Sequence, residues 1–128
     1  VVIGYCYGKG RMARRRVGAL LVGVYSVEDE TYYPIAKVGT GLSEDLWKSL
    51  EIQLNNISTN KAPKNVYDKI IPNVWCEPKI IVSVDFDLIT QSKNYPCGYS
   101  LRFPSLKKIV KDKSLENVTS KREIEGML

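Results

Sequence analysis

The sequence predicts an all-β fold with accessory helices: a five-stranded Greek-key barrel with one helix between its third and fourth strands. Two observations predict it. Five stretches rich in β-branched and aromatic residues are separated by glycine, proline or acidic turns, which is typical of antiparallel strands. One stretch after the third of these carries leucines at helical spacing instead. A chain of 128 residues is long enough for one domain with its own core.

The first three strands are predicted over residues 1–7, 17–26 and 31–38. The loop between the first two holds Gly8, Gly10 and five cations, and the cations are Lys9, Arg11, Arg14, Arg15 and Arg16. Such a loop suits phosphate contacts with a closely approaching backbone, although a solvated charge run has the same composition. An acidic turn, residues 28–30, lies at the other end of the second strand. The charge is therefore predicted to be polarised along that strand.

The helix is predicted to follow the glycine-rich turn at residues 39–41. Ser43 is a suitable N-cap, and Glu44 and Asp45 lie in the first turn, where the helix dipole favours acidic side chains. Five apolar residues recur at nearly helical spacing and are expected to form one buried stripe: they are Leu42, Leu46, Leu50, Leu54 and Ile57. Ser120 is predicted to cap a second, short helix over residues 121–128.

After a long loop at residues 60–73, the fourth strand is predicted over residues 80–89, where apolar side chains alternate with a half-polar face. Asp85 and Asp87 lie on that polar face. Paired carboxylates can bind a metal ion, but no third carboxylate lies in register with them. A solvent-facing strand surface is the preferred interpretation, and no metal site is predicted.

The fifth strand, residues 99–103, runs into Pro104, which cannot donate a ladder hydrogen bond and should end the strand. A lysine-rich run follows, with Lys107, Lys108, Lys111 and Lys113. An exposed arginine and aromatic beside lysines, here Arg102 and Phe103, suit nucleic acid, although a solvated charged tail would look similar. The alternation of side chains along the strand places Phe103 on the same face as Tyr99 and Leu101, towards the core. Its position beside Pro104, at the strand end, instead favours exposure.

The net charge is +5 and the pI about 9.1, which favours an anionic partner.

Three cysteines without a C-x-x-C pair, and no histidine, argue against a zinc site and an imidazole base. Free thiols predict an intracellular location, cytoplasmic in a prokaryote or nuclear in a eukaryote. No apolar run has the length of a membrane span. The chain opens inside a strand pattern without methionine, as expected for a piece of a longer protein. We expect a monomer.

Five strands with a helix after the third are typical of the oligonucleotide-binding (OB) barrel. The chain also resembles, over essentially its whole length, the C-terminal OB domain of ATP-dependent DNA ligases. Six motifs fall in that family's order and spacing. They are Val1-Val2-Ile3-Gly4, Gly8-Lys9-Gly10, Lys37-Val38-Gly39-Thr40-Gly41, Trp75-Cys76-Glu77-Pro78-Lys79, Ile89-Thr90-Gln91-Ser92, and a terminal motif of Leu101-Arg102-Phe103-Pro104, Lys111-Asp112-Lys113 and Val118-Thr119.

The resemblance implies a part in nick sealing, in which AMP passes from ATP to a lysine, then to a 5′-phosphate, and leaves as the 3′-hydroxyl attacks. This is phosphoryl transfer, which needs cations and Mg²⁺ more than a base. The catalytic-lysine motif K-x-D-G is absent, so ATP and Mg²⁺ are expected mainly in an upstream nucleotidyltransferase domain, and this segment alone should be inactive. The resemblance places Asp112 and Lys113 near the pyrophosphate leaving group.

The implied partners are nicked duplex DNA and the upstream domain of the same chain. After the domain rotates, Arg102 and Phe103 would reach the minor groove, with Phe103 as an apolar wedge that favours distorted DNA. The other expected DNA contacts are to backbone phosphates, and they come from Lys9, Arg11, Arg14, Arg15, Arg16, Lys37 and Thr40. Phosphate contacts carry no sequence information, which suits an enzyme that seals any sequence.

The sequence departs from the family at Ser105 and Val110, where an arginine is common. Neighbouring lysines do not reproduce arginine's bidentate grip, so a weaker ATP-dependent first step is expected. Two alternatives remain open. One is a stand-alone OB module that binds single-stranded nucleic acid through the eight tyrosines and the basic loop. The other is the OB domain of an RNA-capping guanylyltransferase.

Overall fold

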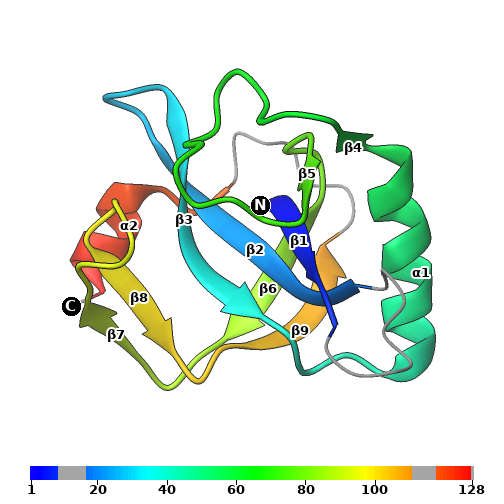
Figure 1. Ribbon diagram of the computed structural model, residues 1–128. Helices are drawn as coiled ribbons and strands as arrows, with labels where there is room; N and C mark the ends of the chain where they lie inside the picture. Colours follow the sequence, from blue (N-terminus) through cyan, green and yellow to red (C-terminus); the bar gives the residue numbers. More distant parts are fainter. Residues whose placement is uncertain (9–16, 111–117, 128) are drawn as a thin grey trace.

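The computed structural model describes residues 1–8, 17–110 and 118–127 (Figure 1). Over these residues nine strands and two helices follow one another, and the chain is mostly β, as the sequence predicts. The strands are β1 (Val2–Tyr7), β2 (Val17–Ser26), β3 (Thr31–Val38), β4 (Ser58–Thr59), β5 (Val74–Cys76), β6 (Ile81–Asp85), β7 (Leu88–Gln91), β8 (Tyr99–Arg102) and β9 (Ser105–Val110). The helices are α1 (Glu44–Asn56), which follows the third strand as predicted, and α2 (Lys121–Gly126).

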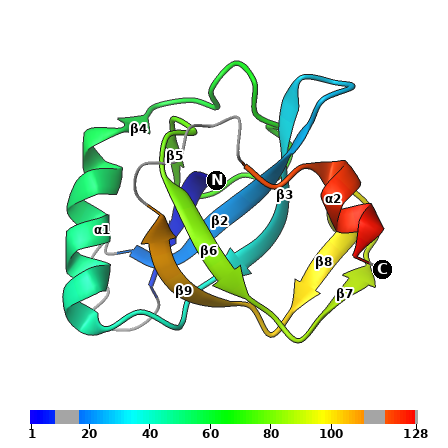
Figure 2. The same cartoon turned by 180° about the vertical axis from the view of Figure 1, so that it is seen from behind.

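The strands form one large sheet and two ribbons. The large sheet has five strands in the order β3-β2-β1-β5-β4, and β6–β9 and β7–β8 are antiparallel pairs. Figure 2 shows the β6–β9 ribbon crossing in front of β1 and β2. The amide of Val2 donates a 2.9 Å hydrogen bond to the carbonyl of Ile80, which connects the large sheet to the start of this ribbon.

Apolar side chains on both faces of β2 are buried. Leu20, Val22 and Val24 belong to the larger core cluster, which also contains Leu106 of β9. Leu21 points to the other face, into a smaller cluster with Val1, Ile3, Trp75 and Val118. Burial on both faces explains why the sequence of β2 is a nearly continuous apolar run.

Helix α1 begins where its cap predicts. The Oγ of Ser43 accepts a hydrogen bond from the amide of Leu46 at 3.4 Å, and Leu50 and Leu54 are fully buried. Leu46 was expected in the buried stripe but is 47% exposed. Steps of four residues advance about 40° around a helix with 3.6 residues per turn. Leu46 therefore falls outside the buried face, and Trp47 packs against the core instead.

The prediction of one strand over residues 80–89 is wrong, because the chain bends at Phe86 and Asp87 and forms β6 and β7. The side-chain alternation shifts by one residue at this bend. Ile89 packs against the core, whereas Phe86 and Leu88 are 37% and 40% exposed. The structure has nine strands instead of the expected five, because the predicted fourth strand is divided in two and because β4, β5 and β9 were not predicted. The loop predicted at residues 60–73 contains no helix or strand.

A strand also replaces the charged tail considered after Pro104. Strand β9 pairs with β6, and its Leu106 is buried in the core. The register shifts between Ser83 and Val84, so Lys107 is an extra residue in the β9 strand. Lys107 and Lys108 are consequently both exposed although they are neighbours in a strand.

Helix α2 is capped by Ser120 as predicted, and Glu123 completes a capping box. Neither helix in the described ranges is long and apolar enough to cross a membrane.

Candidate nucleic-acid interface

The turn between β8 and β9 presents Phe103 to solvent. Its side chain is 73% exposed, and its backbone has a φ of 51°, in the left-handed region. This conformation costs a non-glycine residue about 1–2 kcal/mol, and it is unusual for a residue that precedes proline. The change of backbone direction ends the strand alternation, so Phe103 does not continue the face of Leu101. The core interpretation of Phe103 is therefore wrong, and its exposure is confirmed.

Arg102 lies between an aromatic ring and a carboxylate. Its guanidinium carbon is 5.0 Å from the centre of the Phe103 ring, within cation–π range. Its Nε is 3.9 Å from Oδ2 of Asp87, and both side chains are about half exposed. The amide of Asp87 also donates a 2.9 Å hydrogen bond to the carbonyl of Arg102. The bend after β6 and the turn after β8 therefore lie against each other.

The turn between β3 and α1 reaches the same place. The carbonyl of Thr40 accepts a 2.8 Å hydrogen bond from the amide of Leu106. Gly41 has a φ of 115°, and a Cβ there would overlap the Leu106 carbonyl and lie 2.5 Å from Oγ of Ser105. Figure 1 shows the end of β8, the start of β9 and the segment from β3 to α1 along its lower edge. Thr40 and the Arg102–Phe103 pair are thus brought to one end of the molecule.

Lys37 is exposed near the end of β3, opposite Leu21 of β2. Thr40 is also exposed, three residues further along. Lys107 and Lys108 add two exposed cations on β9, close to the Arg102 turn in the chain. The described residues at this end therefore combine cations with one protruding aromatic ring, which suits a polyanion with flat bases.

Seven of the predicted site residues lie outside the described residues: Lys9, Arg11, Arg14, Arg15, Arg16, Asp112 and Lys113. The residues that flank the arginine segment are described. Tyr7 pairs with Val17, and Leu20 pairs with Val38 at the end of β3. Tyr7 and Val17 therefore lie at the end of the sheet where β3 leads to Thr40. Residues 111–117 are flanked by Val110, which pairs with Ile81, and by the buried Val118.

Ser105 and Val110, the two departures from the family pattern, are the first and last residues of β9. Both are half-buried. Lys107 and Lys108 lie between them and are exposed because of the bulge. Strand β9 thus carries cations on its surface, although the two positions themselves are uncharged.

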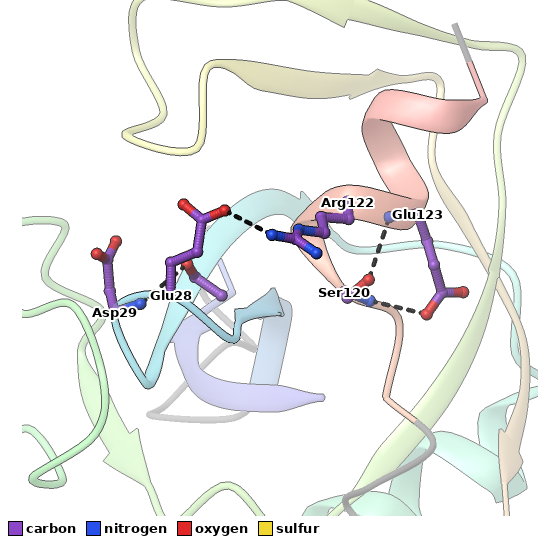
Figure 3. Close-up of polar contacts among 6 residues, drawn as sticks. Glu28, Asp29, Ser120, Arg122 and Glu123 are labelled. Carbon is purple, nitrogen blue, oxygen red and sulfur yellow. Dashed lines mark hydrogen bonds and ion pairs between the residues drawn. The ribbon is translucent and has the colours of Figure 1, made fainter.

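The acidic turn lies at the far end of β2. Glu28 accepts a 3.1 Å hydrogen bond from Arg122 of α2, and Ser120 and Glu123 close the capping box beside it (Figure 3). The arginine end of the predicted charge separation along β2 lies outside the described residues, and Arg122 brings a cation to the acidic end. Asp85 and Asp87 are exposed at the other end, and the described ranges contain no group of three potential metal-binding side chains.

The tyrosines have little free surface. All eight are described, and Tyr5 and Tyr32 are buried while the other six are half-buried. The hydroxyls of Tyr5 and Tyr33 donate to Asn55 and Asp29 at 3.1 and 2.7 Å. The bond to Asp29, with partial burial, raises the pKa of Tyr33. Phe103 is by contrast the most exposed aromatic side chain.

Sequence reasoning missed the role of Asp87 as the neighbour of Arg102. The two residues are 15 positions apart, and only the pairing of Leu88 with Arg102 brings them together. That pairing was not predicted, because it depends on the bend at Phe86 and Asp87, which was not predicted either. The sequence offered no signal for the bend, because apolar residues continue to alternate through Phe86 and Leu88.

Comparison with known proteins agrees with this architecture. The family profile described as "ATP dependent DNA ligase C terminal region" matches residues 13–113. A "Probable DNA ligase" of Dictyoglomus thermophilum is 42% identical over 97% of this chain, and a "DNA ligase" of Hyperthermus butylicus is 32% identical over 99%. The chain spans only 23% and 22% of the length of these two relatives.

Among solved structures, the ligase domain of M. tuberculosis LigD superposes with a TM-score of 0.71 at 28% identity, over 93% of this chain and 37% of that one. A mycobacterial DNA ligase D, solved with ATP and MES, gives a TM-score of 0.68 at 25% identity, over 94% of this chain and 36% of that one. The OB-type fold class predicted from the sequence agrees with these neighbours. The chain belongs to the family of C-terminal regions of ATP-dependent DNA ligases.

Proposed function

We propose that this chain is the DNA-binding domain of a nick-sealing ligase and that the Arg102–Phe103 turn meets the DNA at the nick. The observation that carries this proposal is Phe103, an apolar ring that is 73% exposed on a left-handed backbone. Costly backbone conformations persist mainly at functional sites. An apolar ring that enters the minor groove partly unstacks a base step, and this costs least where the backbone is already broken.

The phosphate contacts are assigned to the cations and polar groups at the same end. Lys37 and Thr40 are exposed there. Tyr7 and Val17, which flank the arginine segment, lie at the same end. Further phosphates are therefore proposed to be neutralised by Lys9, Arg11, Arg14, Arg15 and Arg16. None of these residues is proposed to read base edges, and the enzyme would therefore seal nicks in any sequence.

The nucleotide step is assigned mainly to an upstream domain of the same chain, which is expected to bind ATP and Mg²⁺. The relatives support this, since this chain covers less than a quarter of their length. Asp112 and Lys113 would assist near the pyrophosphate leaving group. When bound there, Mg²⁺ would supply charge neutralisation for phosphoryl transfer.

The test uses the full ligase chain that carries this region. It is incubated with labelled ATP and Mg²⁺, and a nicked duplex is then added. Phe103→Ala should lower sealing of a pre-adenylated nick at least about tenfold, which corresponds to about 1.4 kcal/mol in the barrier, and leave the covalent AMP adduct unchanged. Ile71→Ala is the matched control, because Ile71 is also 73% exposed but lies in the loop before β5.

Three other outcomes are informative. Equal loss of the adduct and of sealing would contradict a nick-specific role for Phe103. Sealing of a pre-adenylated nick without any adduct would assign the loss to the departures at Ser105 and Val110. Neither activity, with intact binding to single strands, would replace the proposal with the stand-alone module.

A further inference from the structure

Asp87 and Arg102 are connected twice. Their backbones share the 2.9 Å hydrogen bond from the Asp87 amide to the Arg102 carbonyl. Their side chains approach to 3.9 Å between Oδ2 and Nε, while the guanidinium carbon is 5.0 Å from the centre of the Phe103 ring. The carboxylate and the ring therefore both act on the guanidinium of Arg102.

The ion pair does not account for the stability of the fold. The two side chains are 54% and 56% exposed, and ion pairs of this kind contribute little because water screens them. Because the ion pair is exposed, the Arg102 guanidinium can readily exchange Asp87 for another anionic partner. A phosphate of the DNA backbone carries the same single negative charge but can accept two hydrogen bonds from the guanidinium, whereas the Asp87 carboxylate approaches it with one oxygen at 3.9 Å.

We propose that Asp87 is a positioning residue of the Arg102–Phe103 turn, an inference that rests on the proposed function. In the free domain its carboxylate holds the guanidinium beside the Phe103 ring. On a nicked duplex the ring enters the groove, and Arg102 passes from Asp87 to a backbone phosphate. On an intact duplex the stacked bases offer no opening for the Phe103 ring, so Arg102 stays paired with Asp87. The Asp87 carboxylate then repels the DNA backbone.

The proposal makes Asp87 a determinant of selectivity for nicked over intact duplex. Asp87→Asn keeps the size of the side chain and removes its charge. Asp85→Asn is the matched control, because Asp85 is an exposed acid on the other side of Phe86 that pairs across the ribbon with Ser105. Within the described ranges Asp85 forms no ion pair.

The experiment compares the affinities of the full ligase chain for a nicked and an intact duplex of one sequence at fixed salt. Asp87→Asn should lower the ratio of the two affinities about two- to fivefold, mainly by tightening binding to the intact duplex. Asp85→Asn should change both affinities by the same factor, because it alters only the general field. In an Arg102→Gln background, Asp87→Asn should no longer change the ratio.

A measurement without DNA tests the geometry itself. The side-chain protons of Arg102 next to the Phe103 ring should show ring-current shifts in the NMR spectrum. These shifts should shrink in Asp87→Asn and persist in Asp85→Asn. Equal behaviour of the two variants in both measurements, or an Asp87→Asn effect that survives Arg102→Gln, would overturn the positioning role. Failure of Phe103→Ala to affect sealing would instead overturn the proposed function, so the two failures are distinguishable.

Discussion

The carbonyl oxygen of Thr40 accepts a 2.8 Å hydrogen bond from the amide of Leu106, and this bond joins the turn before α1 to the start of β9. Thr40 and Leu106 are 66 positions apart in the chain. Their contact fixes the β3–α1 turn against the strand that follows Phe103. The two turns that carry proposed DNA contacts are therefore expected to act as one rigid surface, and changes at their junction should affect both.

Gly41→Ala tests this junction. A methyl group there would overlap the Leu106 carbonyl, and the φ of 115° also disfavours alanine. We expect a loss of about 2–4 kcal/mol in the free energy of unfolding, measured by urea denaturation of the 128-residue chain. Gly98→Ala is the control, because Gly98 has a φ of 87° but nothing within 4 Å of the added carbon. It should lose only about 1 kcal/mol, the conformational part alone. Equal losses at the two sites would show that the junction can open without cost.

Phe103→Gly separates backbone strain from function. Glycine adopts a φ of 51° without the penalty that any larger residue carries. Because Phe103 is mostly exposed, little burial is lost on its removal. The glycine variant should be about 1 kcal/mol more stable than Phe103→Ala in urea denaturation, while both should seal nicks equally poorly. A more active glycine variant would mean that the backbone, and not the ring, carries the function.

The sequence predicts those parts of the fold that depend on local patterns. Strands β2 and β3 and the Ser43 cap of α1 follow from turn residues and from the cap itself, and they lie where predicted. The bend at Phe86 and the strand β9 were missed, since each depends on pairing with a distant segment. A lysine-rich strand also has the composition of a solvated tail, and only the bulge at Lys107 explains how both lysines reach solvent.

The same distinction applies to the site. The family resemblance points to four described residues, and all four are exposed at one end of the molecule: Arg102, Phe103, Lys37 and Thr40. Their partners are not local in sequence. Asp87 reaches Arg102 through the pairing of β7 with β8, and Leu106 reaches Thr40 across the molecule. The family resemblance therefore led to the proposal of these side chains, whereas the contacts that orient them required the fold.

Neutralising Arg14 and Arg15 together tests the arginine segment. If both contact phosphates, the slope of log affinity against log salt should fall by about 0.9 for each lost contact, or about 1.8 in total. The measurement is a salt titration of binding to nicked duplex. Lys61 and Lys64, which are exposed in the loop before β5, are a matched pair of control positions whose neutralisation should leave the slope nearly unchanged. An unchanged slope in the double arginine variant would place that segment off the DNA.

The three cysteines should differ in reactivity. Burial raises the pKa of the Cys76 thiol to about 12 and also raises the pKa of Cys97. Both side chains are buried, whereas Cys6 is half-buried. Because the thiolate is the nucleophile, a disulfide reagent at pH 8 should modify one thiol per native chain, and Cys6→Ser should abolish this reaction. Rapid modification of two or more thiols in native buffer would contradict the burial of β5 and of the segment before β8.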